Sequence, residues 1–117
     1  MRMTEVQFDG RVPVDGYGPG FFRLGGKVLR GAQTVLPAGI APWGGYDDLA
    51  ACLAAAQEID VLFVGTGAEM RPVPQTFRAP LEAVGIGVEF MATPAACRSY
   101  NVLLSEGRRI GLALFPV

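Results

Sequence analysis

The chain has 117 residues, half of them hydrophobic and 18% charged, which predicts a single globular domain over residues 1–117 and excludes disordered, collagen-like and coiled-coil chains. Its 10 basic and 11 acidic residues give a net charge of −1, which excludes an extended basic surface for nucleic acid or an anionic membrane. The lack of histidine excludes Ser-His-Asp and Cys-His catalysis, histidine bases and nearly all zinc and iron sites.

The N-terminal segment shows no targeting signal. Residues Met1 to Arg11 include Glu5 and Asp9 and lack an apolar stretch, unlike a secretory signal or a transit peptide. No apolar run approaches the ~20 residues that a membrane-spanning helix needs. We therefore expect a cytoplasmic protein without a transmembrane segment.

The first 45 residues predict short strands. Two glycines, Gly25 and Gly26, separate the extended runs Phe21–Leu24 and Lys27–Arg30, which is typical of a tight hairpin. A third strand is expected at residues 33–36, where Pro37 stops it. Residues 38–45 contain Pro42 and two adjacent glycines and predict a loop, whose tryptophan, Trp43, should plug one end of the core.

From residue 46 onward the pattern predicts helices that alternate with strands. Residues 46–57 have apolar side chains at helical spacing, and Asp47 and Asp48 stand where they would favour the N-terminal end of a helix. The run Asp60 to Gly65 is short, apolar and rich in β-branched residues, so it predicts a strand buried on both faces.

Two more helix–strand pairs follow. Residues 74–84 predict a helix that buries Phe77, Leu81 and Val84 and stops at Gly85, and residues 87–91 predict a strand. Thr93 is expected to cap a third helix that ends at Gly107, with Pro94 at its first position and Cys97, Tyr100 and Leu104 inward. Residues 109–115 predict the last strand. These elements predict a compact three-layer α/β domain with a mixed central sheet, six or seven strands in all, about three helices and an N-terminal β-hairpin packed at one side.

The turn that follows the predicted central strand is a candidate ligand site. In open α/β sheets, ligands bind beyond the carboxyl ends of strands, and Gly65-Thr66-Gly67 stands at such an end. The run lacks the lysine of a P-loop, Met70 replaces the third glycine of a dinucleotide motif, and Arg71 is the only nearby cation. A tight turn without a ligand is the alternative.

Arg98 and Asn101 are the other candidate ligand-binding residues. They are three positions apart and therefore share one face of the third helix. Arg98 lies near the helix N-terminus, where a cation gains nothing from the helix dipole, so a carboxylate of the fold or a ligand should hold it. In the alternative interpretation, Arg98 forms an internal ion pair and Asn101 bonds to a neighbouring loop backbone. The candidate site thus comprises Gly65, Thr66, Gly67, Arg98 and Asn101.

No residue pattern predicts a catalytic centre, a metal site or a cofactor. Cys52 and Cys97 have no Cys-x-x-Cys spacing and are expected to be buried free thiols, a disulfide or redox pair being the alternative. The scattered carboxylates form no acid/base pair or metal-ligand pattern: Glu69, Glu82 and Glu89. Any catalysis would rest on Cys97, a carboxylate or Tyr100.

Several motifs together resemble a small α/β family, largely uncharacterised in bacteria, that includes the mitochondrial respiratory complex I assembly factor 3. The resemblance runs from about Tyr17 to Pro116, with Ser99 where the family often has threonine. It implies a three-layer fold, no established activity and no cofactor, and its eukaryotic members resemble assembly factors that bind proteins beside a membrane. The motifs are Gly16-Tyr17-Gly18-Pro19-Gly20-Phe21-Phe22, Gly31, Leu36-Pro37, Trp43, Gly65-Thr66-Gly67, Thr93-Pro94-Ala95-Ala96-Cys97-Arg98-Ser99-Tyr100-Asn101 and Glu106-Gly107-Arg108-Arg109.

Two functions follow as hypotheses. The favoured one is a non-enzymatic protein-binding module, an assembly factor for a membrane respiratory complex that contacts protein partners or a second copy of itself, with peripheral contact with that complex and no binding of nucleic acid. The alternative is a small-molecule or anion-binding protein, with or without enzymatic activity, whose site is the Gly65-Thr66-Gly67 turn with Arg98.

Overall fold

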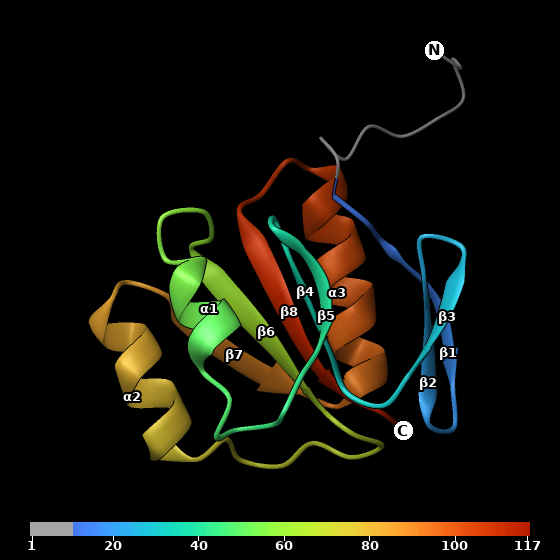
Figure 1. Ribbon diagram of the computed structural model, residues 1–117, viewed down its shortest axis with the longest axis horizontal. Coiled ribbons are helices and arrows are strands. Elements are labelled where there is room, and N and C mark those ends of the chain that lie inside the picture. Colours follow the sequence, from blue (N-terminus) through green and yellow to red (C-terminus); the bar gives the residue numbers. More distant parts are fainter. Residues whose placement is uncertain (1–10) are drawn as a thin grey trace.

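The computed structural model describes residues 11–117, so the prediction about a targeting signal concerns a segment outside the described residues (Figure 1). The described part contains eight strands and three helices, more strands than the six or seven expected from the sequence. In chain order they are β1 (Val14–Gly18), β2 (Phe21–Leu24), β3 (Lys27–Arg30), β4 (Gln33–Leu36), β5 (Gly39–Pro42), α1 (Ala50–Ala54), β6 (Val61–Thr66), α2 (Gln75–Ala83), β7 (Gly87–Met91), α3 (Thr93–Ser105) and β8 (Ile110–Phe115).

The central sheet is mixed, as the sequence predicts. Its strand order is β5-β4-β8-β6-β7. The strands β8, β6 and β7 are parallel, while β4 is antiparallel to both β8 and β5. The register places Val35 beside Leu112 and Leu112 beside Phe63, so apolar side chains follow one another across the sheet.

Helices cover both faces of this sheet and produce the predicted three layers. Figure 1 shows α1 and α2 on one side of the sheet and α3 on the other. Alternate residues of β6 therefore enter different cores: Leu62 packs in the core with Phe77 of α2, whereas Phe63 packs in the core with Tyr100 of α3. The strand β6 is buried on both faces, as predicted, except at its first residue, Val61, which is half-buried. Within residues 11–117, no helix combines the length and apolar character that crossing a bilayer requires.

The predicted N-terminal hairpin is confirmed, and a further strand, β1, pairs with it. Gly25 and Gly26 have φ values of 57° and 81°, which a two-residue hairpin turn requires and glycine adopts freely. The strand β1 pairs antiparallel with β2 and makes a separate three-stranded sheet, β1-β2-β3. The sequence did not predict β1, whose glycines and register shift near Val14 hide the strand pattern. The inner face of this small sheet joins the core around α3 through Phe22 and Leu24.

The loop predicted over residues 38–45 is wrong in its first half. Residues 39–42 form β5, which makes a hairpin with β4 across Pro37 and Ala38. Since β5 is an edge strand, Pro42 at its end has no need of an N–H group. The predicted end of β4 before Pro37 is confirmed.

The first helix is much shorter than predicted, because polar side chains near its start bind the preceding loop. The Asp48 carboxylate accepts a hydrogen bond from the Gly44 N–H at 2.9 Å, and the Asp48 carbonyl accepts one from Trp43 Nε1 at 3.1 Å. Residues 46–49 are therefore held in a turn, and neither aspartate lies in the first helical turn. Trp43 is buried as predicted and packs with three aromatic rings: Tyr46, Phe77 and Phe115.

The other two helices bury most of the residues predicted to face inward, and they differ from the prediction at Val84 and Thr93. In α2, Phe77 and Leu81 are fully buried, but Val84 lies past the helix end and is 46% exposed. Gly85, with φ of +89°, follows as the predicted stop. In α3, three predicted core residues are buried: Cys97, Tyr100 and Leu104. Thr93 makes no cap bond within its own helix, contrary to the expected capping role.

One edge of the central sheet is closed by a side chain of α2. Arg78 Nη2 donates a hydrogen bond at 3.3 Å to the carbonyl of Val88 on the edge strand β7. The guanidinium also lies 5.6 Å from the ring centre of Phe90 and pairs with Glu82 at 3.2 Å. Such a cover reduces the tendency of an edge strand to pair with another chain.

Candidate interaction site

The strand-end turn Gly65-Thr66-Gly67 is closed by a threonine of α3. Gly67 N–H donates to Thr93 Oγ1 at 2.8 Å, Thr93 Oγ1 donates to the Phe115 carbonyl at 2.7 Å, and Thr93 N–H donates to the Gly67 carbonyl at 2.8 Å. This explains why Thr93 does not cap its own helix. The network joins the ends of β6, α3 and β8, and it uses the turn's Gly67 amide within the protein.

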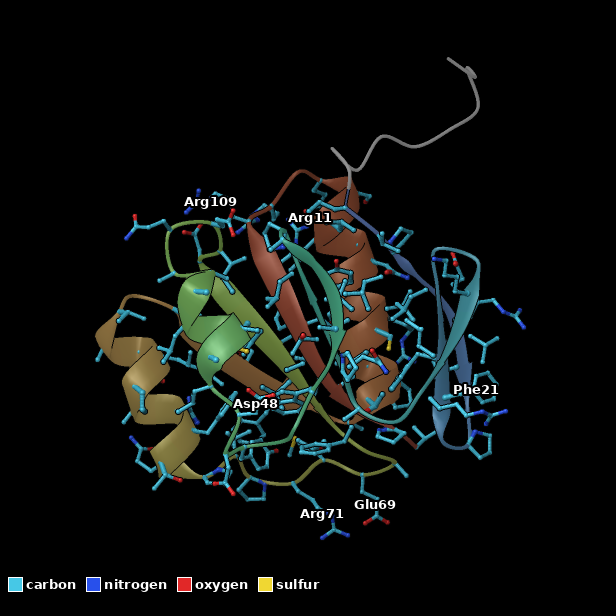
Figure 2. The ribbon with its side chains drawn as sticks, in the orientation of Figure 1. Arg11, Phe21, Asp48, Glu69, Arg71 and Arg109 are labelled. Carbon is cyan, nitrogen blue, oxygen red and sulfur yellow. The ribbon has the colours of Figure 1, made fainter. Side chains whose placement is uncertain are left out.

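The rest of the turn is also bonded internally. Thr66 Oγ1 lies 2.7 Å from the Glu69 carbonyl and accepts a hydrogen bond from the Arg71 N–H at 3.0 Å. Gly65 is required by close approach, since a Cβ there would lie 2.7 Å from Thr93 Oγ1. Figure 2 shows the Arg71 and Glu69 side chains extending away from the body of the protein, and they pair at 3.5 Å while largely exposed. The cation nearest the turn thus points to solvent.

Asn101 binds the backbone of the small sheet. Its Oδ1 accepts a hydrogen bond from Val14 N–H and its Nδ2 donates to the Val14 carbonyl, both at 2.8 Å. Tyr100 adds a bond from its hydroxyl to the Val12 carbonyl at 3.1 Å, and burial raises the pKa of this phenol. Both polar ends of the Asn101 amide are thereby occupied. The alternative left open by the sequence is a bond to a neighbouring loop backbone, and the partner is a backbone, but that of strand β1.

Arg98 lies in a separate hollow beside α3, which we call the α3 groove. The groove has a volume of about 390 Å³ and lies between α3 and β6. The Arg98 side chain is exposed, and no carboxylate in residues 11–117 forms an ion pair with it. The groove is lined by Phe63, Arg98, Ser99, Val102 and Leu103. Of the five candidate residues, the structure therefore brings together Gly65, Thr66 and Gly67, and gives Asn101 and Arg98 different surroundings.

The α3 groove is largely apolar. Val102 is 55% exposed, although it stands on a helix whose other apolar side chains mostly face inward. Phe63, 7% exposed, forms part of the lining between α3 and the sheet. The sequence did not predict this groove, because Val102 gave no signal beyond its position on the outer side of the predicted helix.

The two cysteines are free and buried, as predicted. Burial raises the pKa of Cys97 to about 11, and the neighbouring Arg98 charge lowers it only partly. Burial and the Asp48 charge raise the pKa of Cys52 to about 11. Both thiols are therefore protonated near neutral pH, and a thiol is a poor nucleophile.

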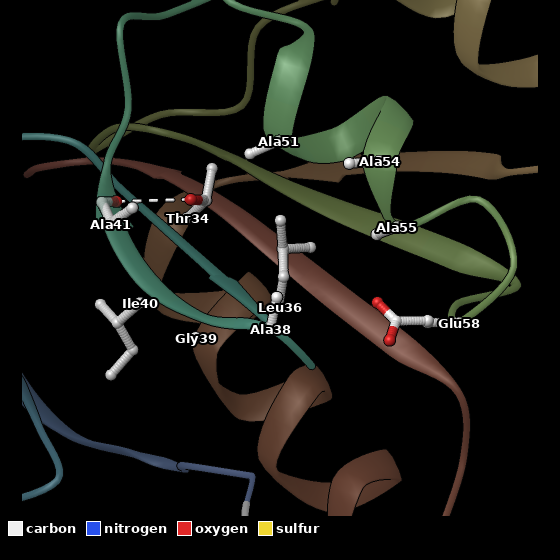
Figure 3. Close-up of a pocket in the computed structure, with 10 residues that line it drawn as sticks. All are labelled: Thr34, Leu36, Ala38, Gly39, Ile40, Ala41, Ala51, Ala54, Ala55 and Glu58. Atoms are coloured by element: carbon white, nitrogen blue, oxygen red, sulfur yellow. Dashed lines mark hydrogen bonds between the residues drawn. The ribbon is translucent and has the colours of Figure 1, made fainter.

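A second hollow lies on the opposite face of the sheet (Figure 3). It has a volume of about 210 Å³ between the β4–β5 hairpin and α1, and its walls are mostly alanine and glycine. Thr34 Oγ1 donates to the Ala41 carbonyl at 3.3 Å, and Glu58 is the one charged residue that lines the hollow. This lining offers no convergent set of polar groups for catalysis. Within residues 11–117, no three potential metal ligands cluster.

The comparisons with known proteins agree on one family. A model described as "Protein of unknown function (DUF498/DUF598)" matches residues 14–115. An uncharacterised protein of Rhodobacter capsulatus is 49% identical over 117 residues, which cover all of this chain and 94% of that protein. The NADH dehydrogenase (ubiquinone) 1 alpha subcomplex assembly factor 3 of Danio rerio is 35% identical over 86% of this chain. The chain spans 62% of that assembly factor's length.

Solved structures show the same fold. A crystal structure described as an outer membrane protein of Bartonella henselae has a TM-score of 0.85 and 37% identity, over 95% of this chain and 99% of that one. A solution structure of a protein from Rhodopseudomonas palustris has a TM-score of 0.76 and 30% identity, over 100% of this chain and 93% of that one. A Bordetella pertussis protein with a TM-score of 0.76 and 29% identity, over 99% of this chain and 92% of that one, is described as a Mth938-like domain.

Proposed function

Since this chain belongs to the DUF498/DUF598 family and is similar to a respiratory assembly factor along most of its length, we propose that it is a non-enzymatic protein-binding module that helps a membrane respiratory complex to assemble. It works from the cytoplasm and contacts the complex peripherally. The proposed function is inferred from the relatives of this chain. The α3 groove is the surface of this chain that supports the inference.

The α3 groove has the composition of a protein-binding surface. Such surfaces combine apolar side chains with arginine at their centre, because arginine contributes both a charge and an extended apolar stem. Here Val102 and Leu103 supply the apolar part and Arg98 the charge. A carboxylate on the partner would complete an ion pair that residues 11–117 do not provide.

The closed turn supports binding of proteins over binding of a small anion. Its Gly67 amide and Thr66 hydroxyl already have partners within the chain. A phosphate or carboxylate would have to break these bonds, and removing a buried hydrogen bond costs about 1–3 kcal/mol. Arg98 faces the α3 groove and not this turn.

Substitution of Val102 by aspartate tests the proposal. The tagged chain is expressed in its native host, and the proteins that co-purify with it are quantified by mass spectrometry. The wild type is expected to retain subunits of a membrane respiratory complex, and Val102→Asp should reduce their recovery at least tenfold. The matched control is Val84→Asp, which places the same charge at a valine of similar exposure on another face.

Two results would contradict the proposal. One is equal recovery of respiratory subunits by wild type and Val102→Asp. The other is recovery of none by the wild type when its thermal midpoint shows that it is folded. Both valines are about half exposed, so neither variant should change the free energy of unfolding by more than ~0.5 kcal/mol.

A further inference from the structure

The edge strands of the two sheets face a common groove, which we call the β3–β5 groove. Its volume is about 380 Å³. The strand β3 is at one edge of the small sheet, and β5 is at one edge of the central sheet. It is lined by Leu24, Lys27, Val28, Leu29, Arg30, Gln33, Ile40 and Pro42.

This groove offers unpaired backbone groups on its two edge strands, although the Arg30 carbonyl of β3 is already bonded to Gln33. Each edge strand of an antiparallel pair turns a row of N–H and C=O groups away from its neighbour. On β5, proline at Pro42 removes one of the N–H groups, so β5 is the poorer template for a new strand. On β3 every residue keeps its N–H, and Val28 at its middle is 50% exposed. A further strand would therefore add to β3.

A buried glutamine supplies an acceptor in this groove. Gln33 is only 3% exposed, and its Nε2 donates at 3.0 Å to the Arg30 carbonyl, the backbone group that β3 turns toward it. That bond fixes the amide orientation, so Oε1 is the free end. No donor in residues 11–117 reaches Gln33 Oε1, which is open to solvent. A partner N–H in the groove would replace water there.

The charged residues that line the β3–β5 groove are both basic. Lys27 and Arg30, both exposed, are the charged residues that line it. A second copy of this chain is a poor occupant, because pairing β3 with its own copy brings two Lys27 and two Arg30 side chains together along about 13 Å, and like charges repel. Side chains alternate along a strand, so Lys27 and Arg30 point to opposite faces of β3, and an acidic segment could pair with both through one carboxylate on each of its own faces.

We propose that the β3–β5 groove binds a short, extended, acidic segment of a partner protein, which adds to β3 as a further strand. The four residues of β3 span about 13 Å, so the segment pairs through about four residues. Its backbone bonds to β3, its carboxylates pair with Lys27 and Arg30, and one N–H reaches Gln33 Oε1. This inference rests on the proposed protein-binding function but uses a surface separate from the α3 groove.

Selection from a random octapeptide library displayed on phage tests this site with the full chain. The wild type is expected to enrich peptides with an excess of aspartate and glutamate beside β-branched or aromatic residues. The most enriched octapeptide is then synthesised, and its affinity is measured by fluorescence polarisation. Lys27→Glu/Arg30→Glu should weaken it at least tenfold. Arg23→Glu, which reverses an exposed cation of β2 outside the groove, should leave it within twofold.

Amide chemical shifts locate the peptide. On titration, the largest shifts are expected at Val28, Arg30 and Ile40, and thermal midpoints confirm that the variants are folded. The proposal is overturned if no peptide is enriched, if the enriched peptides carry no acidic excess, or if the double reversal leaves affinity unchanged. Loss of peptide binding in Val102→Asp alone would move the site to the α3 groove, which removes this inference and leaves the proposed function standing.

Discussion

Removal of the Asn101 amide should loosen the small sheet more than the rest of the protein. In Asn101→Ala, the Val14 N–H and C=O lose two hydrogen bonds of 2.8 Å each. Each such bond contributes about 1 kcal/mol net, so the free energy of unfolding should fall by about 2 kcal/mol. Val14 is 7% exposed, which limits how far water can replace the lost partners.

Urea unfolding and native-state hydrogen exchange measure this effect. The unfolding midpoint should shift to lower urea with an unchanged slope, since the surface exposed on unfolding stays the same. Exchange at Phe22 and Leu29 of the small sheet should become about 30-fold faster, the factor that 2 kcal/mol represents. If the small sheet opens locally, the exchange rate at Leu62 in the central sheet should increase less.

Two further variants test whether loss of the Asn101 amide causes the loss of stability. Ser99→Ala truncates a side chain two positions away that makes no hydrogen bond in residues 11–117, so stability should stay within ~0.5 kcal/mol of wild type. Asn101→Asp keeps the acceptor for the Val14 N–H but places a carboxylate oxygen against the Val14 carbonyl, and it should be at least as harmful as alanine. A loss below 0.5 kcal/mol in both Asn101 variants would refute the reasoning.

Two other predictions concern the turn and the thiols. Gly65→Ala brings a Cβ to 2.7 Å from Thr93 Oγ1 and 2.8 Å from Leu114 Cδ2, and it should cost about 1–3 kcal/mol by thermal unfolding, whereas Gly16→Ala meets no atom within 4 Å and serves as the control. Equal thermal midpoints for these two variants would contradict the steric argument. The pKa values of Cys52 and Cys97 rise from 9.0 to about 11 on folding, so the folded state holds their protons more tightly and stability should fall as pH rises from 9 to 11. Urea unfolding at pH 8 and pH 10.5 should show a smaller fall in a Cys52→Ala/Cys97→Ala variant, and equal falls would count against the thiols as the cause.

Local sequence patterns, such as turn glycines and apolar runs, made several elements of the fold predictable. The turn at Gly25 and Gly26 needs positive φ at both positions, so two glycines were enough to predict it. The buried β6 was predictable from its apolar run. The shortness of α1 was not, because it depends on the Asp48 carboxylate binding Gly44, and an acidic residue before an apolar run equally predicts a helix start.

The sites depend on contacts that no local pattern contains. The sequence marked the Gly65–Gly67 turn, but Thr93 closes it from 26 positions away. It allowed Asn101 a backbone partner, yet that partner, Val14, lies 87 positions earlier. The β3–β5 groove exists because two different sheets end side by side, and neither edge can be identified before the strand order is known.

The pairing of β4 with β8 has a consequence for synthesis on the ribosome. Val35 pairs with Leu112, 77 positions later in the chain (112 − 35), so the antiparallel and parallel halves of the central sheet stay unconnected until β8 has been synthesised. The neighbouring hairpins of β1 to β3 can close as soon as they leave the exit tunnel. A product truncated before Ile110 would therefore carry a finished hairpin beside two half-sheets with no strand to join them.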